Sequence, residues 1–240
     1  MKTTLDKNKQ TKESLSLSQV TARDLPDAWF QAICEVVNNG FDYTIERGSY
    51  KGTKRKELDF ITIKITHPGT RPLTPDIPPQ LGLDPPATNE YVENYLIYLM
   101  TSQKQKNEQY TYGEFLEPQI KEVIRMYKEE GHGTNQACMA VCDPKSIYLE
   151  DPPCLRQVDT RIRYGKLHFI VYFRSWDLWS GFPVNLGGLQ LLKEYMAEEI
   201  GVGDGEIIAC SKGLHLYEYA WPLADMRLGK HEIPKGQEAK

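Results

Sequence analysis

Residues 151–185 read DPPCLRQVDTRIRYGKLHFIVYFRSWDLWSGFPVN, and we expect the fold to be built around this stretch. Apolar residues recur through 155–163 and 167–173, which predicts two strands. A turn then leads into a helix expected from 185 to 200, which Gly201 ends. This short stretch therefore predicts both a sheet and a helix that packs with it.

The rest of the chain predicts further elements of both kinds. Pro26 favours the first turn of a helix that ends before Gly40, and isoleucine alternates with polar residues over 61–65 as in a half-buried strand. Proline recurs through 66–89, which predicts a long, stiff loop. Further helices are expected over 91–101 and 115–130, and further strands over 138–142, 206–210 and 214–219. This order predicts an α+β fold with one large twisted mixed β-sheet flanked by helices.

The N-terminal stretch differs in composition from the rest. It is polar and mixed in charge, so we expect a disordered lead-in over 1–23 and a single catalytic domain over 24–240. The stretch lacks the apolar segment of a secretory signal. No window in the chain approaches the ~18 apolar residues of a membrane span, so no membrane partner is expected.

Charge and cysteine content restrict the function classes. The formal net charge of −4 does not indicate a nucleic-acid partner, because such proteins carry a basic excess. The odd count of five cysteines is a poor disulfide framework and favours a reducing, cytoplasmic location. Cys138 and Cys142 have no second Cys or His pair near them, so no metal site is expected.

Cys154 follows two prolines at the start of an expected strand, and a rigid Pro-Pro step holds its thiol in one place. Arg174 and Ser175 follow the next strand. An arginine near a thiol favours the thiolate, which is the nucleophilic form of cysteine. Arg174 and Ser175 together also suit a phosphate oxygen. The three residues indicate a nucleophile beside an anion site.

Asn185 and the pair His215 and Tyr217 offer polar groups for a nucleobase and a sugar. The Asn185 amide can donate and accept at once, which suits the adjacent carbonyl and N–H of a uracil edge. His215 and Tyr217 stand two positions apart on an expected strand. Both side chains therefore lie on one face, where they could hold a ribose hydroxyl.

Four motifs, Pro-Pro-Cys, Arg-Ser-x-Asp, Gly-x-Pro-x-Asn and His-x-Tyr, resemble those of the thymidylate synthases in order and spacing. The intervals are 20 residues from Cys154 to Arg174, 11 from Arg174 to Asn185, and 30 from Asn185 to His215. The resemblance is clear over 110–221. The short C-terminus and the DPPC step resemble the short archaeal-type thymidylate synthases.

This resemblance implies a methyltransferase that converts dUMP to dTMP in deoxynucleotide biosynthesis, on a thymidylate synthase-like fold. The Cys154 thiolate adds to carbon 6 of the uracil, and carbon 5 then attacks the one-carbon unit of a reduced pterin. The pterin is methylene-tetrahydrofolate or methylene-tetrahydromethanopterin, and the sequence does not decide between them. The resemblance also implies a homodimer whose two sheets pack back to back.

The resemblance further implies roles for individual residues. The implied catalytic residues are Cys154, Tyr112, Arg174 and Glu93. Tyr112 assists proton removal through water, and Glu93 organises that water, with Glu90 as the alternative. The implied dUMP-binding residues are Arg47, Arg174, Ser175, Asn185, His215 and Tyr217. Asp177 is implied to orient the pterin.

The main departure from the family pattern lies at Thr134, Asn135 and Gln136, where the family carries an arginine pair donated across the dimer. A charge-assisted hydrogen bond contributes about 1.5–3 kcal/mol, so phosphate binding needs a substitute. The candidates are Lys51, Lys54, Arg55, Lys56 and Arg156, among which the sequence does not choose. The basic cluster over 51–56 is also consistent with a solvated turn. Trp176 and Trp179 suit either a pterin site or the core.

Two other functions fit the same residues. A nucleotide hydroxymethylase, in which water replaces the hydride, uses the same intermediate, so a methyl and a hydroxymethyl product both stay open. Relatives that act on dCMP carry aspartate at the position of Asn185, so Asn185 favours uracil. A catalytically silent nucleotide-binding homologue is favoured by the missing arginine pair. It is opposed by the presence of Cys154, Tyr112 and Arg174, because binding alone needs no thiolate.

Overall fold

The computed structural model describes residues 14–230, with gaps at 105, 107–108 and 142. Its strands form a six-stranded mixed sheet and a smaller four-stranded sheet. The large sheet has the order β1 (Leu17–Ala22), β4 (Phe60–Ile65), β9 (Gly203–Ser211), β7 (Lys166–Phe173), β6 (Leu155–Arg163) and β5 (Cys138–Ala140). The small sheet has the order β2 (Phe41–Thr44), β3 (Lys54–Glu57), β10 (Leu214–Tyr217) and β8 (Trp176–Asp177). The predicted α+β class and the large mixed sheet are confirmed.

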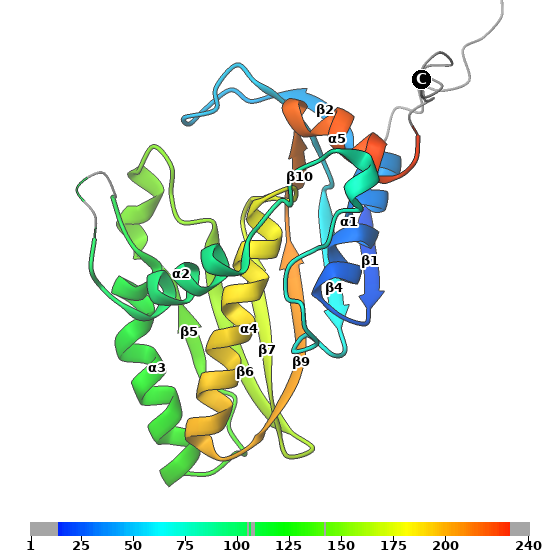
Figure 1. The fold of residues 1–240 in the computed structure, drawn as a ribbon. Helices are drawn as coiled ribbons and strands as arrows, with labels where there is room; N and C mark the ends of the chain where they lie inside the picture. The colour runs from blue at the N-terminus through cyan, green and yellow to red at the C-terminus, as the bar shows by residue number, and fades with distance from the viewer. Residues whose placement is uncertain (1–13, 105, 107–108, 142, 231–240) are drawn as a thin grey trace, which may run out of the picture.

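The helices are α1 (Leu25–Asn39), α2 (Asn89–Met100), α3 (Tyr112–Glu129), α4 (Gly181–Ile200) and α5 (Trp221–Arg227), with short 3₁₀ turns η1 (Pro79–Leu81), η2 (Pro144–Tyr148) and η3 (Glu218–Ala220). On one face of the large sheet, α1, α3 and α4 contact the strands and α2 packs on α3 and α4, whereas α5 packs on α1 and η3. In Figure 1, α1 to α4 lie in front of the strands. Alternate strand residues such as Phe169 and Val171 of β7 and Ile63 of β4 are buried. The main core therefore lies between these helices and the sheet. None of the helices in the described ranges is long and apolar enough to cross a bilayer.

The β6–β7 hairpin sets the geometry at one end of the sheet. Tyr164 and Gly165 form its two-residue turn with φ of 55° and 70°, as a type I′ turn requires. The antiparallel register then runs along both strands with one bulge near the start of β6. It places Cys154 and Arg174, which flank the strands, opposite each other, and the Arg174 N–H donates to the Cys154 carbonyl at 2.9 Å. A local turn thus joins residues twenty positions apart.

Helices α2 and α4 pack closely because α4 carries two consecutive glycines. A Cβ on Gly187 would lie 2.8 Å from the Val92 side chain, and one on Gly188 would lie 2.5 Å from the Tyr95 ring. Only glycine leaves room for this approach. The packing holds α2, with Tyr95, against the centre of the domain.

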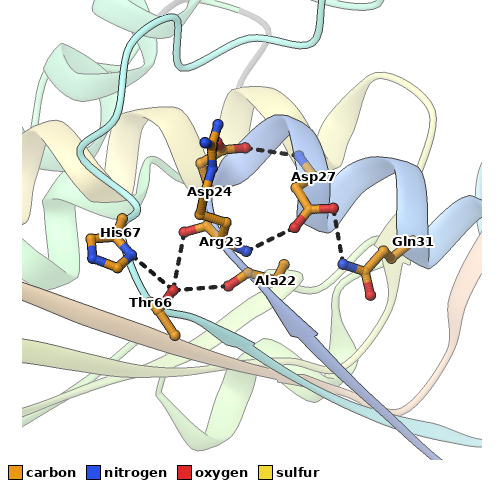
Figure 2. Close-up of polar contacts among 7 residues, drawn as sticks. All are labelled: Ala22, Arg23, Asp24, Asp27, Gln31, Thr66 and His67. Atoms are coloured by element: carbon orange, nitrogen blue, oxygen red, sulfur yellow. Dashed lines mark hydrogen bonds and ion pairs between the residues drawn. The ribbon is translucent and has the colours of Figure 1, made fainter.

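The start of α1 is fixed by carboxylates, as Figure 2 shows. Asp24 caps the helix, because its Oδ1 accepts from the Asp27 N–H at 3.0 Å, and the Asp27 carboxylate in turn accepts from the Arg23 N–H at 2.8 Å. The backbone of Thr66 and His67 donates to the carbonyls of Ala22 and Arg23. The turn between β1 and α1 is therefore tied to the end of β4.

The structure corrects several boundaries. Residues 17–22, expected in a disordered lead-in, form β1, because Val20 and Ala22 are buried against the core. The rest of the division into a lead-in and one domain stays a prediction, and residues 1–13 lie outside the described residues. The strand expected over 214–219 ends at Tyr217 and belongs to the small sheet, which the sequence did not indicate. Helix α4 begins at Gly181 and not at Asn185.

The cap of α1 yields a stability prediction. Asp24→Ala removes the acceptor for the Asp27 N–H, so we expect the free energy of unfolding to fall by about 1 kcal/mol. Asp24→Asn keeps an acceptor and should cost much less, since the Arg23 partner of Asp24 is 72% exposed and such ion pairs contribute little. Urea denaturation of both variants measures this difference. Equal losses in the two variants would show that the cap is not the source.

Candidate active site

The Arg174 side chain is anchored on the Pro-Pro step that precedes Cys154. Its Nε donates to the carbonyls of Pro152 (3.2 Å) and Pro153 (3.1 Å), and its Nη2 also donates to Pro152. Hydrogen bonds from a charged donor are about twice as strong as neutral ones. These contacts hold the guanidinium beside Cys154 at the end of the β6–β7 hairpin.

Cys154 opens onto a cavity of about 520 Å³. The cavity walls come from β3 and β10 of the small sheet, from the loops around residues 45–50 and 151–154, and from residues next to the ends of β4, β7 and β9 in the large sheet. Five of the residues predicted from sequence line it: Arg47, Cys154, Arg174, Ser175 and Tyr217. The structure therefore brings the expected nucleophile and most of the expected anion-binding groups into one space.

The charge state of Cys154 reflects a competition between burial and nearby arginines. Burial raises the pKa of the Cys154 thiol above its usual range and is the dominant effect. Arg174 acts against it and lowers the pKa, Asp151 raises it, and Arg55 lowers it. Because burial prevails, the thiol is the main form of Cys154 at neutral pH.

Two tyrosines lie near Cys154. Tyr112 is the first residue of α3, and Tyr110 lies just before that helix. Tyr112 is buried, and its hydroxyl accepts from the Leu155 N–H at 3.3 Å. Burial raises the pKa of Tyr112 well above its usual value. Tyr110 lines the cavity, and burial raises its pKa to about 12. Tyr112 thus supports the start of β6 from behind, while Tyr110 faces the cavity.

His215 lies behind Tyr217 and does not line the cavity. Their rings pack edge to face with centroids 4.6 Å apart. Burial lowers the pKa of His215 to about 4, so the ring is neutral at neutral pH. Its Nδ1 lies 2.9 Å from the Gly213 carbonyl and carries the proton, which leaves Nε2 as an acceptor. Nε2 is buried and has no hydrogen-bond partner among residues 14–230 outside the gaps.

Asn185 and Asp177 are engaged near the start of α4. The Asn185 Oδ1 accepts from the Trp176 Nε1 at 2.9 Å. The Asp177 carboxylate accepts from the Gly181 N–H and the Ser180 hydroxyl, each at 2.9 Å, which explains why α4 begins at Gly181. Neither side chain lines the cavity of Cys154. Their expected uracil and pterin contacts stay predictions.

Glu93 and its alternative Glu90 are exposed on α2. Glu93 lines a second cavity of about 540 Å³, away from the one that contains Cys154. The α2 side chains in ring contact with Tyr112 are Tyr95 and Tyr98, with centroids 6.2 Å and 5.2 Å away. The structure thus places tyrosines on the side where the sequence suggested a glutamate.

Several residues of the cavity were missed or left undecided by the sequence. Tyr110 and Lys212 were missed, and Arg55 was only one of five candidates. Tyr110 could have been suspected, since it stands two positions before Tyr112. Nothing in the sequence distinguishes Arg55 from its basic neighbours, because their orientation depends on how β3 pairs.

The two tryptophans that the sequence offered for a pterin site, Trp176 and Trp179, are packed among other aromatic rings. Trp176 is stacked between Phe173 and Phe182 at 4.1 Å and 4.4 Å, and Trp179 packs on Trp29 at 5.2 Å, so both tryptophans belong to the core. Within the described part of the chain, no three His, Cys, Asp or Glu side chains gather as metal ligands. Cys142 lies outside the described residues.

Comparison with known proteins points to one family. Residues 97–237 match the family profile described as Thymidylate synthase. A protein of Methanosarcina mazei named "Putative thymidylate synthase" is 29% identical over 212 residues, which cover 86% of this chain and 92% of the relative. Proteins of the same name from Methanococcoides burtonii and Methanocaldococcus jannaschii are each 30% identical, covering 84% and 68% of this chain and 90% and 76% of the relatives.

The competition at Cys154 predicts a pH profile for alkylation. Only the thiolate reacts with iodoacetamide, so the rate should be low at pH 7 and rise as the pH passes the raised pKa. Arg174→Gln removes a charge that lowers this pKa, so the midpoint should move to higher pH and the rate at pH 7.5 should fall several-fold. Arg161→Gln, at the other end of β6, should leave the profile unchanged. An unchanged or lower midpoint in Arg174→Gln would contradict the electrostatic account.

Proposed function

Because the chain belongs to the thymidylate synthase family, we propose that it catalyses the reductive methylation of dUMP to dTMP with a methylene-tetrahydropterin. The observation that carries this proposal is the shared cavity of Cys154, Arg174 and Ser175. A nucleophile and an anion site in one space of about 520 Å³ match a substrate that has a reactive ring and a phosphate.

The residues act in a defined order in the proposed reaction. Arg174, Ser175 and Arg47 bind the phosphate and place the uracil over Cys154. The thiolate adds to carbon 6, and the electron pair of the 5,6 double bond makes carbon 5 a nucleophile toward the methylene unit of the pterin. Loss of the proton on carbon 5 and elimination of the tetrahydropterin leave a methylene group on carbon 5. Hydride from the tetrahydropterin reduces this methylene to methyl, the pterin is oxidised to its dihydro form, and the sulfur leaves carbon 6. Tyr112 assists the proton loss through water. Tyr110, which lines the cavity, limits the space that this water can occupy.

The remaining predicted residues complete the substrate and pterin contacts in this proposal. Tyr217 and His215 hold the 3′ hydroxyl of the sugar, Tyr217 directly from the cavity wall and His215 only if its buried Nε2 becomes accessible from the cavity. Asn185 pairs with the uracil edge, and Asp177 orients the pterin. Glu93 organises water only if α2 moves toward Cys154, since it lines a different cavity. The carbon donor is a methylene-tetrahydrofolate or a methylene-tetrahydromethanopterin.

We also propose a homodimer in which the large sheets pack back to back. In the described residues, no helix covers the face of the large sheet opposite α1 to α4. Ile170 of β7 and Ile208 of β9 are paired in register on that face and are only half-buried. Tyr172 and Cys210 form the next pair. A second copy of this face would bury these apolar side chains, as homodimer interfaces do.

Tritium release tests the catalytic proposal. Wild-type protein should release tritium from 5-tritiated dUMP with one of the two pterins, and Cys154→Ser should abolish release because the hydroxyl is a far weaker nucleophile. Cys138→Ser, at an exposed cysteine of β5, is the matched control and should keep full activity. Mass spectrometry of the product separates dTMP from hydroxymethyl-dUMP.

Two results of the tritium experiment would contradict the catalytic proposal. If wild-type protein binds dUMP but releases no tritium with either pterin at high protein concentration, the chain is a silent nucleotide-binding homologue. Release that persists in Cys154→Ser would exclude this cysteine as the nucleophile.

Light scattering after size exclusion tests the dimer. The wild-type protein should elute with twice the chain mass of 27.6 kDa. Ile170→Asp combined with Ile208→Asp should shift it to a monomer, because the interface would bury two unpaired charges per subunit. Tyr91→Asp, on the exposed surface of α2, is the control and should stay dimeric. A monomeric wild-type protein at micromolar concentration would refute this part of the proposal.

A further inference from the structure

We propose that Arg55 binds the phosphate of the nucleotide together with Arg174 and Ser175 of the same chain. This inference rests on the proposed function and identifies the residue that replaces the arginine pair missing at 134–136. It makes the phosphate site independent of a partner subunit at these positions.

The pairing of β3 directs Arg55 into the cavity. Arg55 stands opposite Tyr217 of β10 and Tyr43 of β2 in the small sheet. Its side chain is only 18% exposed, and it lines the cavity of Cys154. Side chains alternate along a strand, so its neighbour Lys56 points elsewhere, where it pairs with Asp42 at 2.6 Å.

Two sides of the Arg55 guanidinium are fixed by the small sheet. Its Nε donates to the Tyr43 hydroxyl, and its Nη2 pairs with Glu57 at 2.9 Å. The guanidinium also lies over the Tyr43 ring, 4.8 Å from its centroid. The head group is therefore oriented before any ligand arrives, which reduces the entropy lost on binding.

The third side of the guanidinium faces the predicted anion site. Its Nη1 lies 3.4 Å from the Ser175 hydroxyl oxygen, which is a long and weak hydrogen bond. A phosphate oxygen is a stronger acceptor for the same N–H, and a guanidinium presents parallel donors that match phosphate geometry. Arg174 lines the same cavity as Arg55 and Ser175, so a phosphate at the Ser175 hydroxyl would share this space with two guanidinium groups.

The other four candidates, Lys51, Lys54, Lys56 and Arg156, do not line the cavity of Cys154. Lys56 is engaged with Asp42. The stretch 134–136, where the family carries its arginine pair, lies far from Cys154 of the same chain. Its Asn135 accepts a hydrogen bond from Arg161 at 2.8 Å, near the end of β6 that is remote from Cys154. Arg174, Arg55 and Arg156 all lower the pKa of the Cys154 thiol, but of these three only Arg174 and Arg55 line the cavity. Arg55 therefore fits the phosphate role better than its basic neighbours on β3.

The test compares the affinities for dUMP and for deoxyuridine, which lacks the phosphate, by isothermal titration calorimetry. Removing Arg55 alone would leave Glu57, which is 15% exposed, without its ion-pair partner. The test variant is therefore Arg55→Gln combined with Glu57→Gln, with Glu57→Gln alone as its reference and Arg55→Lys as a second variant. Lys56→Gln is the matched control for loss of one positive charge from β3.

The expected result is a loss specific to the phosphate. Relative to Glu57→Gln, the double variant should bind dUMP about 10- to 150-fold more weakly, with deoxyuridine affinity unchanged. Arg55→Lys should lose part of this, because it keeps the charge but not the paired donors. Lys56→Gln should bind both ligands as the wild type does.

Two outcomes would overturn the inference. If the double variant binds dUMP as well as its reference does, or loses dUMP and deoxyuridine equally, Arg55 does not contact the phosphate. If the wild-type protein binds neither ligand, the proposed function itself fails. Failure of the proposed function can be distinguished from failure of the Arg55 inference, because it is seen with the wild-type protein before any substitution is made.

Discussion

The contact between the Arg174 guanidinium and the carbonyls of Pro152 and Pro153 is the interaction on which the site depends. Proline lacks an N–H and has a fixed φ, so the Pro-Pro step presents its carbonyls in a fixed direction. The guanidinium joins that step to the end of β7, while the Arg174 N–H joins β7 to Cys154. One residue thereby positions the thiol and provides the charge beside it.

This arrangement has an electrostatic consequence. Seven ionisable residues line the cavity besides the cysteine and tyrosines: Arg47, Arg55, Arg174, Lys212, Glu57, Asp59 and Asp151. The carboxylates offset most of the positive charge, so the site does not attract anions by a large net field. Binding of a phosphate must therefore depend on oriented donors, such as the fixed guanidinium groups of Arg55 and Arg174. The same balance leaves the Cys154 pKa raised, because the arginines do not overcome burial.

The two sheets position different residues of the site. The large sheet carries Cys154 and Arg174 at the end of one hairpin and buries the main core against the helices. The small sheet brings Arg55 and Tyr217 to the same cavity through the pairing of β3 with β10. Helix α1 links them, since Trp29 donates to the carbonyls of Leu178 and Trp179 just after β8. The cavity therefore forms only when both sheets are in place.

The sequence by itself determined the features that arise from local geometry. A two-residue turn and alternation along β6 and β7 were enough to place Cys154 beside Arg174 and Ser175, because strand pairing repeats every two residues. Only the tertiary structure decided that Arg55 enters the cavity, that His215 is buried behind Tyr217, and that Glu93 lies elsewhere. These outcomes depend on which distant strand or helix covers each face, and a linear pattern carries no information about that partner.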